Sequence, residues 1–271
     1  MISIIKKPVA FIKRELIAEA SYKFSFLSQF PKIFFSVLTF FFLSKLIGDF
    51  GAPHLDAYGG SYFAFVLIGV AFQGYISVSM SEISQIIREG QMLGTLETLL
   101  MTQTSVPTII FSSSLYSYIW STFRVGVYIF LGAFIFGVDI QNTNLISAFV
   151  ILILTITAFS GLGIISASFV MIFKRGDPIS WIIGAGSTLL GGLYYPISVL
   201  PAWLQKFSYI FPITYSLEGM RLAVLKGYSL SELKSIITML MGFSVLILPI
   251  CILIFQYAVK KAKMDGTLTH Y

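Results

Sequence analysis

The sequence predicts an all-α integral membrane protein with six transmembrane helices, and its composition gives the first reason. Of the 271 residues, 56% are hydrophobic and only 11% are charged, whereas a soluble domain carries roughly 25% charged residues. The mean hydropathy is +0.87. Polar segments divide the chain into six apolar runs, and about 20 apolar residues suffice for a helix to cross a bilayer. We expect no sizeable soluble catalytic domain beside them.

Residues 1–23 precede the first apolar run and mix basic, acidic and apolar side chains. That mixture does not match the composition of a cleaved signal peptide. We interpret 1–23 as an amphipathic interfacial helix, with its apolar side chains toward the lipid tails and its lysines toward lipid phosphates. A solvated basic leader is the alternative.

The six apolar runs form one transmembrane domain over 24–259, which is followed by a tail over 260–271. The fifth run is short for a complete crossing at about 1.5 Å per residue, and Gly191-Gly192 interrupts its end. The spans are predicted over 24–47, 61–80, 108–136, 145–173, 179–193 and 236–259.

The segment 194–215, between the fifth and sixth spans, does not have the composition of an ordinary loop. Its prolines interrupt regular backbone, and its aromatic rings suit the membrane interface. We therefore predict short re-entrant helices that dip into the outer leaflet near an exit from the bundle. The candidate residues of this exit segment and its flank are Tyr195, Pro196, Pro201, Trp203, Pro212, Glu218 and Arg221.

The distribution of basic residues predicts the orientation. Twelve of them, Lys32 included, fall on the side of the two termini, and five fall on the other side. Because cytoplasmic flanks carry the excess of Lys and Arg, we expect both termini in the cytoplasm. The pI near 9.3 then follows from membrane topology, and we expect no nucleic-acid partner.

A polar segment from Arg88 to Pro107 lies between the second and third spans, on the predicted cytoplasmic side. Leucines and methionines recur in it at helical spacing, which predicts an amphipathic helix over about 88–105. Its acidic residues, Glu89 and Glu97 among them, fit poorly to an anionic leaflet. A protein partner is therefore favoured over the alternative, a loop helix resting on lipid head groups.

The third span carries a polar stripe that includes Arg124. Helical spacing keeps these residues on one face, and an arginine at mid-depth costs at least about 2.5 kcal/mol on insertion scales unless it has a partner or a watery cavity. Ser117, Ser121 and Arg124 are thus candidate pathway residues for an anionic head group. The alternatives are that Arg124 pairs with Glu218 or reaches the outer interface. The stripe consists of Ser113, Ser114, Ser117, Ser121, Arg124 and Tyr128.

Residues for catalysis are scarce. His54, His270 and Cys251 lie far apart in the sequence, and no HExxH, GxSxG or P-loop motif occurs. We therefore expect neither catalysis nor a metal site from this chain.

Two segments together resemble the ABC-2 type permeases, the membrane subunits of bacterial ABC exporters. One is 89–100, with the core Gly94-Thr95-Leu96-Glu97. The other is 192–221, with Tyr194-Tyr195-Pro196 near its start and Glu218-Gly219-Met220-Arg221 at its end. With six predicted spans and an amphipathic N-terminus, the resemblance extends over nearly the whole chain.

The resemblance implies that the 88–105 segment is a coupling helix bound to a separately encoded ATP-binding subunit. It also implies two such subunits, which would hold ATP and Mg, and two permeases, forming a homodimer or a heterodimer in the bacterial inner membrane. This chain would bind no cofactor itself. The implied contact residues are Glu89, Gly90, Gly94, Thr95, Leu96 and Glu97.

The implied substrate is amphipathic or lipid-linked: a glycolipid or polysaccharide precursor, or a hydrophobic drug. A membrane channel or scaffold subunit without ATP coupling is the alternative function. The sequence offers no carbonyl-filter motif or charged ring in its favour. A membrane enzyme is disfavoured by the missing catalytic groups.

Overall fold

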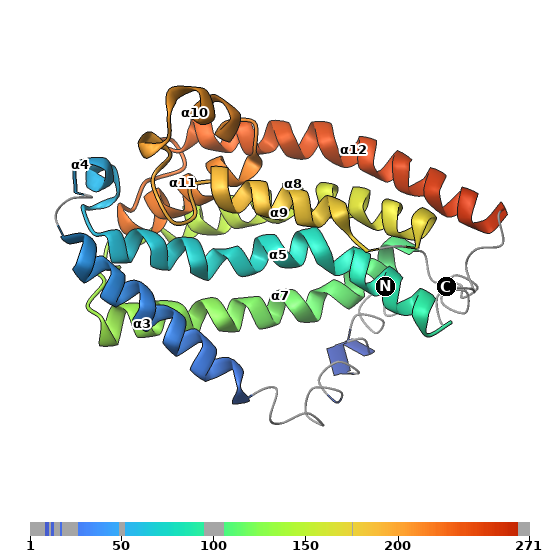
Figure 1. Cartoon of the computed structure of the whole chain (residues 1–271), viewed down its shortest axis with the longest axis horizontal. Coiled ribbons are helices and arrows are strands. Elements are labelled where there is room, and N and C mark those ends of the chain that lie inside the picture. Colours follow the sequence, from blue (N-terminus) through green and yellow to red (C-terminus); the bar gives the residue numbers. More distant parts are fainter. Residues whose placement is uncertain are drawn as a thin grey trace.

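The computed structural model describes residues 9–10, 12–13, 17, 27–48, 52–94, 106–174 and 176–264. These residues form helices and connecting turns, and no β-strand occurs among them. Figure 1 shows the long helices packed side by side in one elongated bundle. Five helices among these residues are long and apolar enough to cross a membrane, so the chain is a multi-pass membrane protein whose described part is all-helical. They are α3 (Gln29–Ile47), α5 (Tyr62–Met92), α7 (Val106–Phe130), α8 (Leu145–Phe173) and α12 (Lys234–Met264).

The remaining elements are short. A π-helical turn, η3, continues α7, and α9 takes the place of the predicted fifth span. Helix α9 has 13 residues, which corresponds to about 20 Å, less than the thickness of the hydrocarbon core. The short elements are α4 (Ala52–Leu55), η2 (Asp56–Tyr58), η3 (Leu131–Ile135), α9 (Pro178–Leu190), η4 (Ile197–Val199), α10 (Ala202–Ser208) and α11 (Pro212–Leu225).

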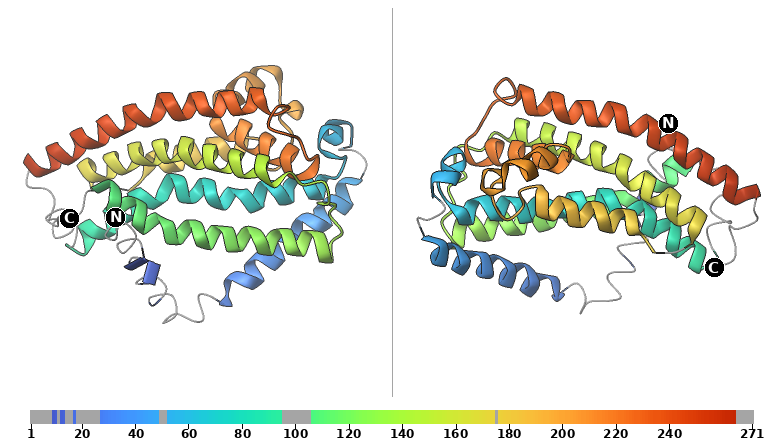
Figure 2. Two further views of the ribbon diagram at one scale, coloured as in Figure 1. Left: turned by 180° about the vertical axis from the view of Figure 1, so that it is seen from behind. Right: turned by 45° about the horizontal axis from the view of Figure 1, so that its top comes forward.

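Helices α5 and α8 form the centre of the bundle. Helix α5 is buried along most of its length, whereas α3, α7 and α12 expose most of theirs. Helix α8 packs against α5, α11 and α12, and α12 lies along α8 in both views of Figure 2. The exposed faces carry large apolar side chains, such as Phe35, Phe134 and Leu253, which suit contact with lipid.

A glycine on α8 permits the closest contact between these two central helices. A Cβ atom on Gly163 would lie 2.3 Å from the carbonyl oxygen of Ser79 and 2.8 Å from that of Met80. Both oxygens belong to the backbone of α5, so they cannot turn away as a flexible side chain would. The approach of α5 to α8 therefore depends on the missing side chain at this position.

Helix α5 is longer than the predicted span, which ended at Met80. It continues to Met92 because Ile83 and Ile87 pack into an apolar cluster with Val170 and Met171 of α8. Arg88–Met92 therefore form the last turn of α5, and the helix predicted over 88–105 does not begin at residue 88. Its remainder, 95–105, lies outside the described residues.

The other predicted spans agree with helices to within a few residues, and α8 has the predicted bounds. Of the interfacial helix predicted over 1–23, the structure describes 9–10, 12–13 and 17, all helical. Helix α12 runs to Met264, so the first part of the predicted tail is helical.

The segment after α9 contains the predicted short helices, η4 and α10, and then the longer α11. Helix α11 extends to Leu225, well past the predicted end of the re-entrant segment. Figure 1 shows α10 at the same end of the bundle as α4, whereas the C-terminal ends of α5 and α12 lie at the opposite end. The predicted exit segment and the predicted partner contact thus lie at opposite ends of the molecule.

One buried arginine holds this end together. Arg221 on α11 is only 3% exposed, and its Nε donates to the carbonyl of Phe65 at 3.0 Å. Its Nη2 donates to the carbonyl of Leu193 at 2.9 Å, and its guanidinium carbon lies 3.4 Å from the centroid of the Phe65 ring. A single side chain therefore joins α11, α5 and the turn after α9.

Candidate functional site

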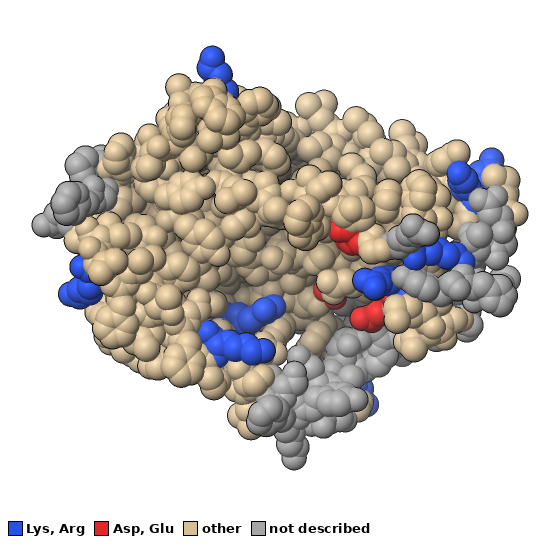
Figure 3. Space-filling view, viewed as in Figure 1, with Lys and Arg blue, Asp and Glu red and all other residues tan. Residues whose placement is uncertain are grey.

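A polar cavity of about 660 Å³ lies between α3, α5 and α7. Figure 3 shows the corresponding face of the molecule, which is hollowed near its lower middle, with basic side chains at the left of the hollow and both acidic and basic side chains to its right. Polar side chains from all three helices line the cavity. They are Gln29, Lys32, Gln73, Ser77, Ser81, Glu82, Gln85, Ser121 and Arg124.

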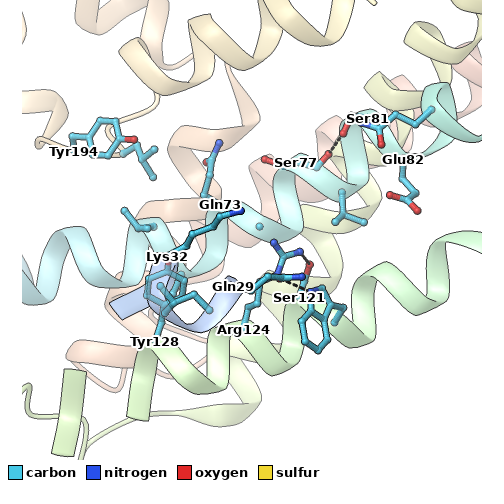
Figure 4. A pocket seen from close by; sticks show the side chains of 18 residues that line it. Gln29, Lys32, Gln73, Ser77, Ser81, Glu82, Ser121, Arg124, Tyr128 and Tyr194 are labelled. Atoms are coloured by element: carbon cyan, nitrogen blue, oxygen red, sulfur yellow. Dashed lines mark hydrogen bonds between the residues drawn. The ribbon is translucent and has the colours of Figure 1, made fainter. Parts of the chain in front are cut away.

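The cationic end of the cavity is formed by Lys32, Gln73 and Arg124. Arg124 lies near the middle of the span Ser114–Ile135, and its Nη2 donates to Ser121 Oγ at a long 3.4 Å. Within the described part of the chain, the buried Arg124 Nε and the buried Gln73 Oε1 have no hydrogen-bond partner. Figure 4 shows Lys32 and Arg124 reaching the same region of the cavity from different helices. Unused hydrogen-bonding capacity therefore gathers beside two positive charges.

The acidic end of the cavity is formed by Glu82, which accepts a hydrogen bond from Ser117 Oγ at 2.7 Å. Ser117 precedes Arg124 by seven residues on the same helix, a separation of about 10 Å along the axis. Figure 4 likewise shows Glu82 farther along α5 than the region reached by Arg124 and Lys32. The carboxylate and the two cations thus occupy different parts of the cavity.

The structure brings the three predicted pathway residues to this cavity. Ser121 and Arg124 line it, and Ser117 contacts Glu82, which also lines it. The alternative pairing of Arg124 with Glu218 is wrong, because Glu218 lines a second cavity of about 200 Å³ at the α4 end of the bundle.

Sequence reasoning missed Lys32 and Gln73. Lys32 was counted only among the basic residues on the side of the termini, whereas the structure shows that it lines the cavity from α3. A signal for α5 was present, because polar residues recur every four positions at 73, 77, 81 and 85, within a stretch that also contains Ser79, Glu82 and Ser84. Such spacing keeps polar side chains on one helical face.

The predicted exit residues gather at the second cavity or on the surface near it. Pro196, Glu218 and Arg221 line that cavity. Trp203 on α10 is 63% exposed, and the Tyr195 hydroxyl donates to the carbonyl of Leu189. Pro201 immediately precedes α10 and Pro212 begins α11, so both prolines mark helix starts, where a missing N–H is tolerated.

The opposite end of α5 carries the predicted partner contact. Glu89 is exposed, whereas Gly90 and Gln91 are buried, and Gln91 Nε2 donates to the carbonyl of Met171 on α8 at 3.3 Å. Gly94 follows in a turn with φ of 67°, a conformation that favours glycine. The other predicted contacts, Thr95, Leu96 and Glu97, lie outside the described residues.

An aspartate in the turn between α8 and α9 ties three helices together near this end. Asp177 accepts hydrogen bonds from Ser84 Oγ of α5 at 2.5 Å, from Ser166 Oγ of α8 and from the backbone N–H of Ser180 in α9 at 2.9 Å. The last bond caps the N-terminus of α9. A shift of any one of the three helices therefore strains the contacts of the other two.

The same contacts set the ionisation of Asp177. Burial is the largest influence and raises its pKa, but the hydrogen bonds from Ser166, Ser84 and Ser180 together outweigh burial, so the pKa lies below its ordinary value of 3.8. Hydrogen bonds to the charged form have this effect. Asp177 is thus a carboxylate at neutral pH.

We expect Asp177→Asn to lower the free energy of unfolding by about 2 kcal/mol at neutral pH, because the amide replaces charge-assisted hydrogen bonds with weaker ones. A lowered pKa in the folded state adds stability above the unfolded pKa and loses it as the pH falls through the folded value. The difference in thermal stability between wild type and variant should therefore shrink below about pH 4.

Thermal unfolding in detergent between neutral and acidic pH measures this difference. Asp139→Asn is the matched control, since Asp139 is exposed and accepts its hydrogen bond from the nearby backbone N–H of Gln141. A difference that is independent of pH would contradict the role given to the Asp177 carboxylate.

Comparison with known proteins identifies relatives. A family model described as ABC-2 type transporter matches residues 9–225, a range that contains the polar cavity. The chain is 24% identical over 194 residues to "Inner membrane transport permease YadH" of Escherichia coli (strain K12), which covers 70% of this chain and 73% of the relative. The protein of the same name from Shigella flexneri matches with the same identity and coverage.

Proposed function

The chain belongs to the ABC-2 type transporter family as a membrane permease, and on that premise we propose that it is the membrane-spanning half of an ATP-driven exporter. Its substrate is amphipathic or lipid-linked, such as a glycolipid or polysaccharide precursor or a hydrophobic drug. The matched domain lacks an ATPase domain, and the family implies association with an ATP-binding subunit.

One observation carries this proposal: α5 lines the polar cavity and also ends at the predicted partner contact. It contributes cavity residues from Val70 to Gln85 and continues without interruption to Met92. A force applied at the exposed Glu89 would therefore reach the cavity through a single helix. A polar cavity inside an apolar bundle in turn suits a substrate with a polar head and an apolar body.

In the proposed assembly, two permeases, identical or different, combine with two ATP-binding subunits that hold ATP and Mg. The chain crosses the inner membrane of a bacterium six times, with α9 as the short fifth span, and both termini are cytoplasmic. The 88–105 segment is seated on the ATP-binding subunit and includes the contacts Glu89, Gly90, Gly94, Thr95, Leu96 and Glu97.

ATP-driven closure of the partner subunits would push on the end of α5. Because α5 meets α8 closely at Gly163, and Asp177 bonds to α5, α8 and α9, a push on α5 would be passed to its neighbours. Rigid-body motion of packed elements is a common way to convert a local push into a larger rearrangement. The polar cavity would then change its access from one side of the membrane to the other.

The proposal predicts that the double variant Glu89→Lys, Glu97→Lys loses co-purification with the ATP-binding subunit by at least about tenfold, because reversing two charges at the proposed contact destroys its electrostatic complementarity. Substrate export should fall with it, while the permease remains in the membrane. Quantitative pull-down of the ATP-binding subunit, together with an export assay, measures both effects.

Asp56→Lys provides the control, because Asp56 is exposed in η2 at the opposite end of the bundle. Intact co-purification and export in the double variant would mean that this segment is not the contact. If the wild-type chain itself did not co-purify with any ATP-binding subunit, the alternative of a channel or scaffold without ATP coupling would take the place of the proposal.

A further inference from the structure

We propose that the cationic end of the polar cavity binds the phosphate of an anionic lipid, with Lys32 and Arg124 as its two positive ligands. This inference rests on the proposed export function and names the chemical class of the substrate: an amphiphile whose phosphate-bearing head enters the cavity while its acyl chains stay outside.

The first argument is charge. Among the described residues that line the cavity, two are cations and one, Glu82, is a carboxylate. Glu82 accepts a hydrogen bond from Ser117, and Ser117 stands about two helical turns from Arg124 along α7. Arg124 lies near the middle of a span, where a charge is costly unless an anion or water joins it, and Lys32, exposed on α3, adds a second positive charge to the same cavity.

The second argument is hydrogen bonding. Arg124 has a buried Nε that lacks a partner within the described part of the chain, and its Nη2 makes only a long bond to Ser121. The planar guanidinium fork matches the oxygens of a phosphate with two parallel donors. Lys32 is exposed on the cavity wall and supplies a second charge on a flexible stem. Gln73 adds a buried carbonyl oxygen without a partner there, which can accept a hydroxyl of the head group.

The third argument is shape, and it favours a lipid over a free phosphate ion. The cavity volume of about 660 Å³ is far larger than one phosphate needs and falls within the range of small-molecule sites. On the same helix, Phe35 stands three residues from Lys32, a spacing that keeps the two on one helical face, and its ring is exposed. This ring offers an apolar surface for acyl chains beside the phosphate ligand.

The test uses the full chain purified in detergent and depleted of lipid. Binding of dioctanoyl phosphatidylglycerol is compared with binding of dioctanoylglycerol, which has the same chains but no phosphate. We expect the phosphate-bearing lipid to bind at least about tenfold more tightly, since hydrogen bonds to charged groups are the stronger class. Equal binding of the two lipids would overturn the inference.

Two variants locate the phosphate. Lys32→Gln and Arg124→Gln should each weaken phosphatidylglycerol binding by about tenfold and leave dioctanoylglycerol binding unchanged. Lys45→Gln removes the same charge from the same helix but outside the cavity, so it should bind like wild type. Lys32 is exposed, so its substitution leaves the packing intact. An unchanged affinity of Lys32→Gln for phosphatidylglycerol would therefore overturn the inference, even if Arg124→Gln did not fold.

Competition with inorganic phosphate distinguishes the two sources of the anion. If phosphatidylglycerol stays bound in excess phosphate, the site recognises the head group together with its chains, as proposed. Displacement by phosphate alone would overturn the lipid assignment. Co-purification with the ATP-binding subunit is measured on the same samples. If the chain binds phosphatidylglycerol but does not co-purify with that subunit, the export function is contradicted. If the chain co-purifies with the subunit but binds the two lipids equally, this inference is contradicted.

Discussion

Gly163→Ala is expected to lower the free energy of unfolding by about 3 kcal/mol, at the upper end of the range for overpacking. The added methyl group would lie 2.3 Å from the Ser79 carbonyl oxygen and 2.8 Å from that of Met80. Both oxygens are backbone atoms of a buried helix, so α5 and α8 must separate along their shared surface. Separation would also withdraw Ile83 and Ile87 from the apolar cluster that they form with α8.

Thermal unfolding of the purified chain in detergent measures this loss. Gly126→Ala is the matched control, because Gly126 lies inside α7 and a Cβ atom there would meet nothing within 4 Å. The control should unfold near the wild-type temperature or slightly above it, since alanine favours helix more than glycine does. Equal unfolding temperatures for the Gly163 and Gly126 variants would show that α5 and α8 do not approach as described.

Arg221→Leu should cost about 3–5 kcal/mol, because two buried carbonyls lose a charged donor and each such hydrogen bond contributes about 1.5–3 kcal/mol. The carbonyls of Phe65 and Leu193 would lose their donor, and the ring of Phe65 would lose the guanidinium stacked on it. Arg221→Lys should be intermediate, because an ammonium keeps the charge but lacks the planar fork that reaches two carbonyls at once.

Two measurements together identify this role. Thermal unfolding gives the loss of stability, and the rate of tryptic cleavage at the exposed Lys206 on α10 should rise if the segment after α9 loosens. Lys226→Leu is the control, because Lys226 is exposed at the end of α11. A stable Arg221→Leu protein with unchanged cleavage would mean that Arg221 does not hold the three elements together.

The long helices were predictable because each is one continuous apolar run. Helix α8 is the clearest example, since its bounds agree with the predicted span. Helix α5 was predicted too short because its last three turns are mostly polar. The apolar contact with α8 there is a narrow stripe, Ile83 and Ile87, and a stripe of two residues hardly changes the average hydropathy. Helix α11 was missed because it is short and of mixed polarity.

The candidate site was predictable in part for a similar reason. Ser121 and Arg124 share one helical face, and spacing within one helix can be read from the sequence. That Lys32 faces the same cavity depends on how α3 packs against α5 and α7, which spacing does not reveal. Arg221 was assigned to an exit segment. Its burial inside the protein depends on contacts with residues 28 and 156 positions away in the sequence, which the local sequence does not reveal.

The close approach at Gly163 also determines how α5 can tilt. Helix α5 has 31 residues, and Ser79 stands 13 residues before its end at Met92 and 17 residues after its start at Tyr62. If the tight contact at Ser79 serves as a pivot, the arms are about 20 Å and about 25 Å long. A push at Met92 would then swing Tyr62 the opposite way by a slightly larger distance, whereas Gln73, about 9 Å from the pivot, would move less than either end. The cationic end would keep its geometry while the far end of the bundle, where Arg221 meets Phe65, takes up most of the displacement.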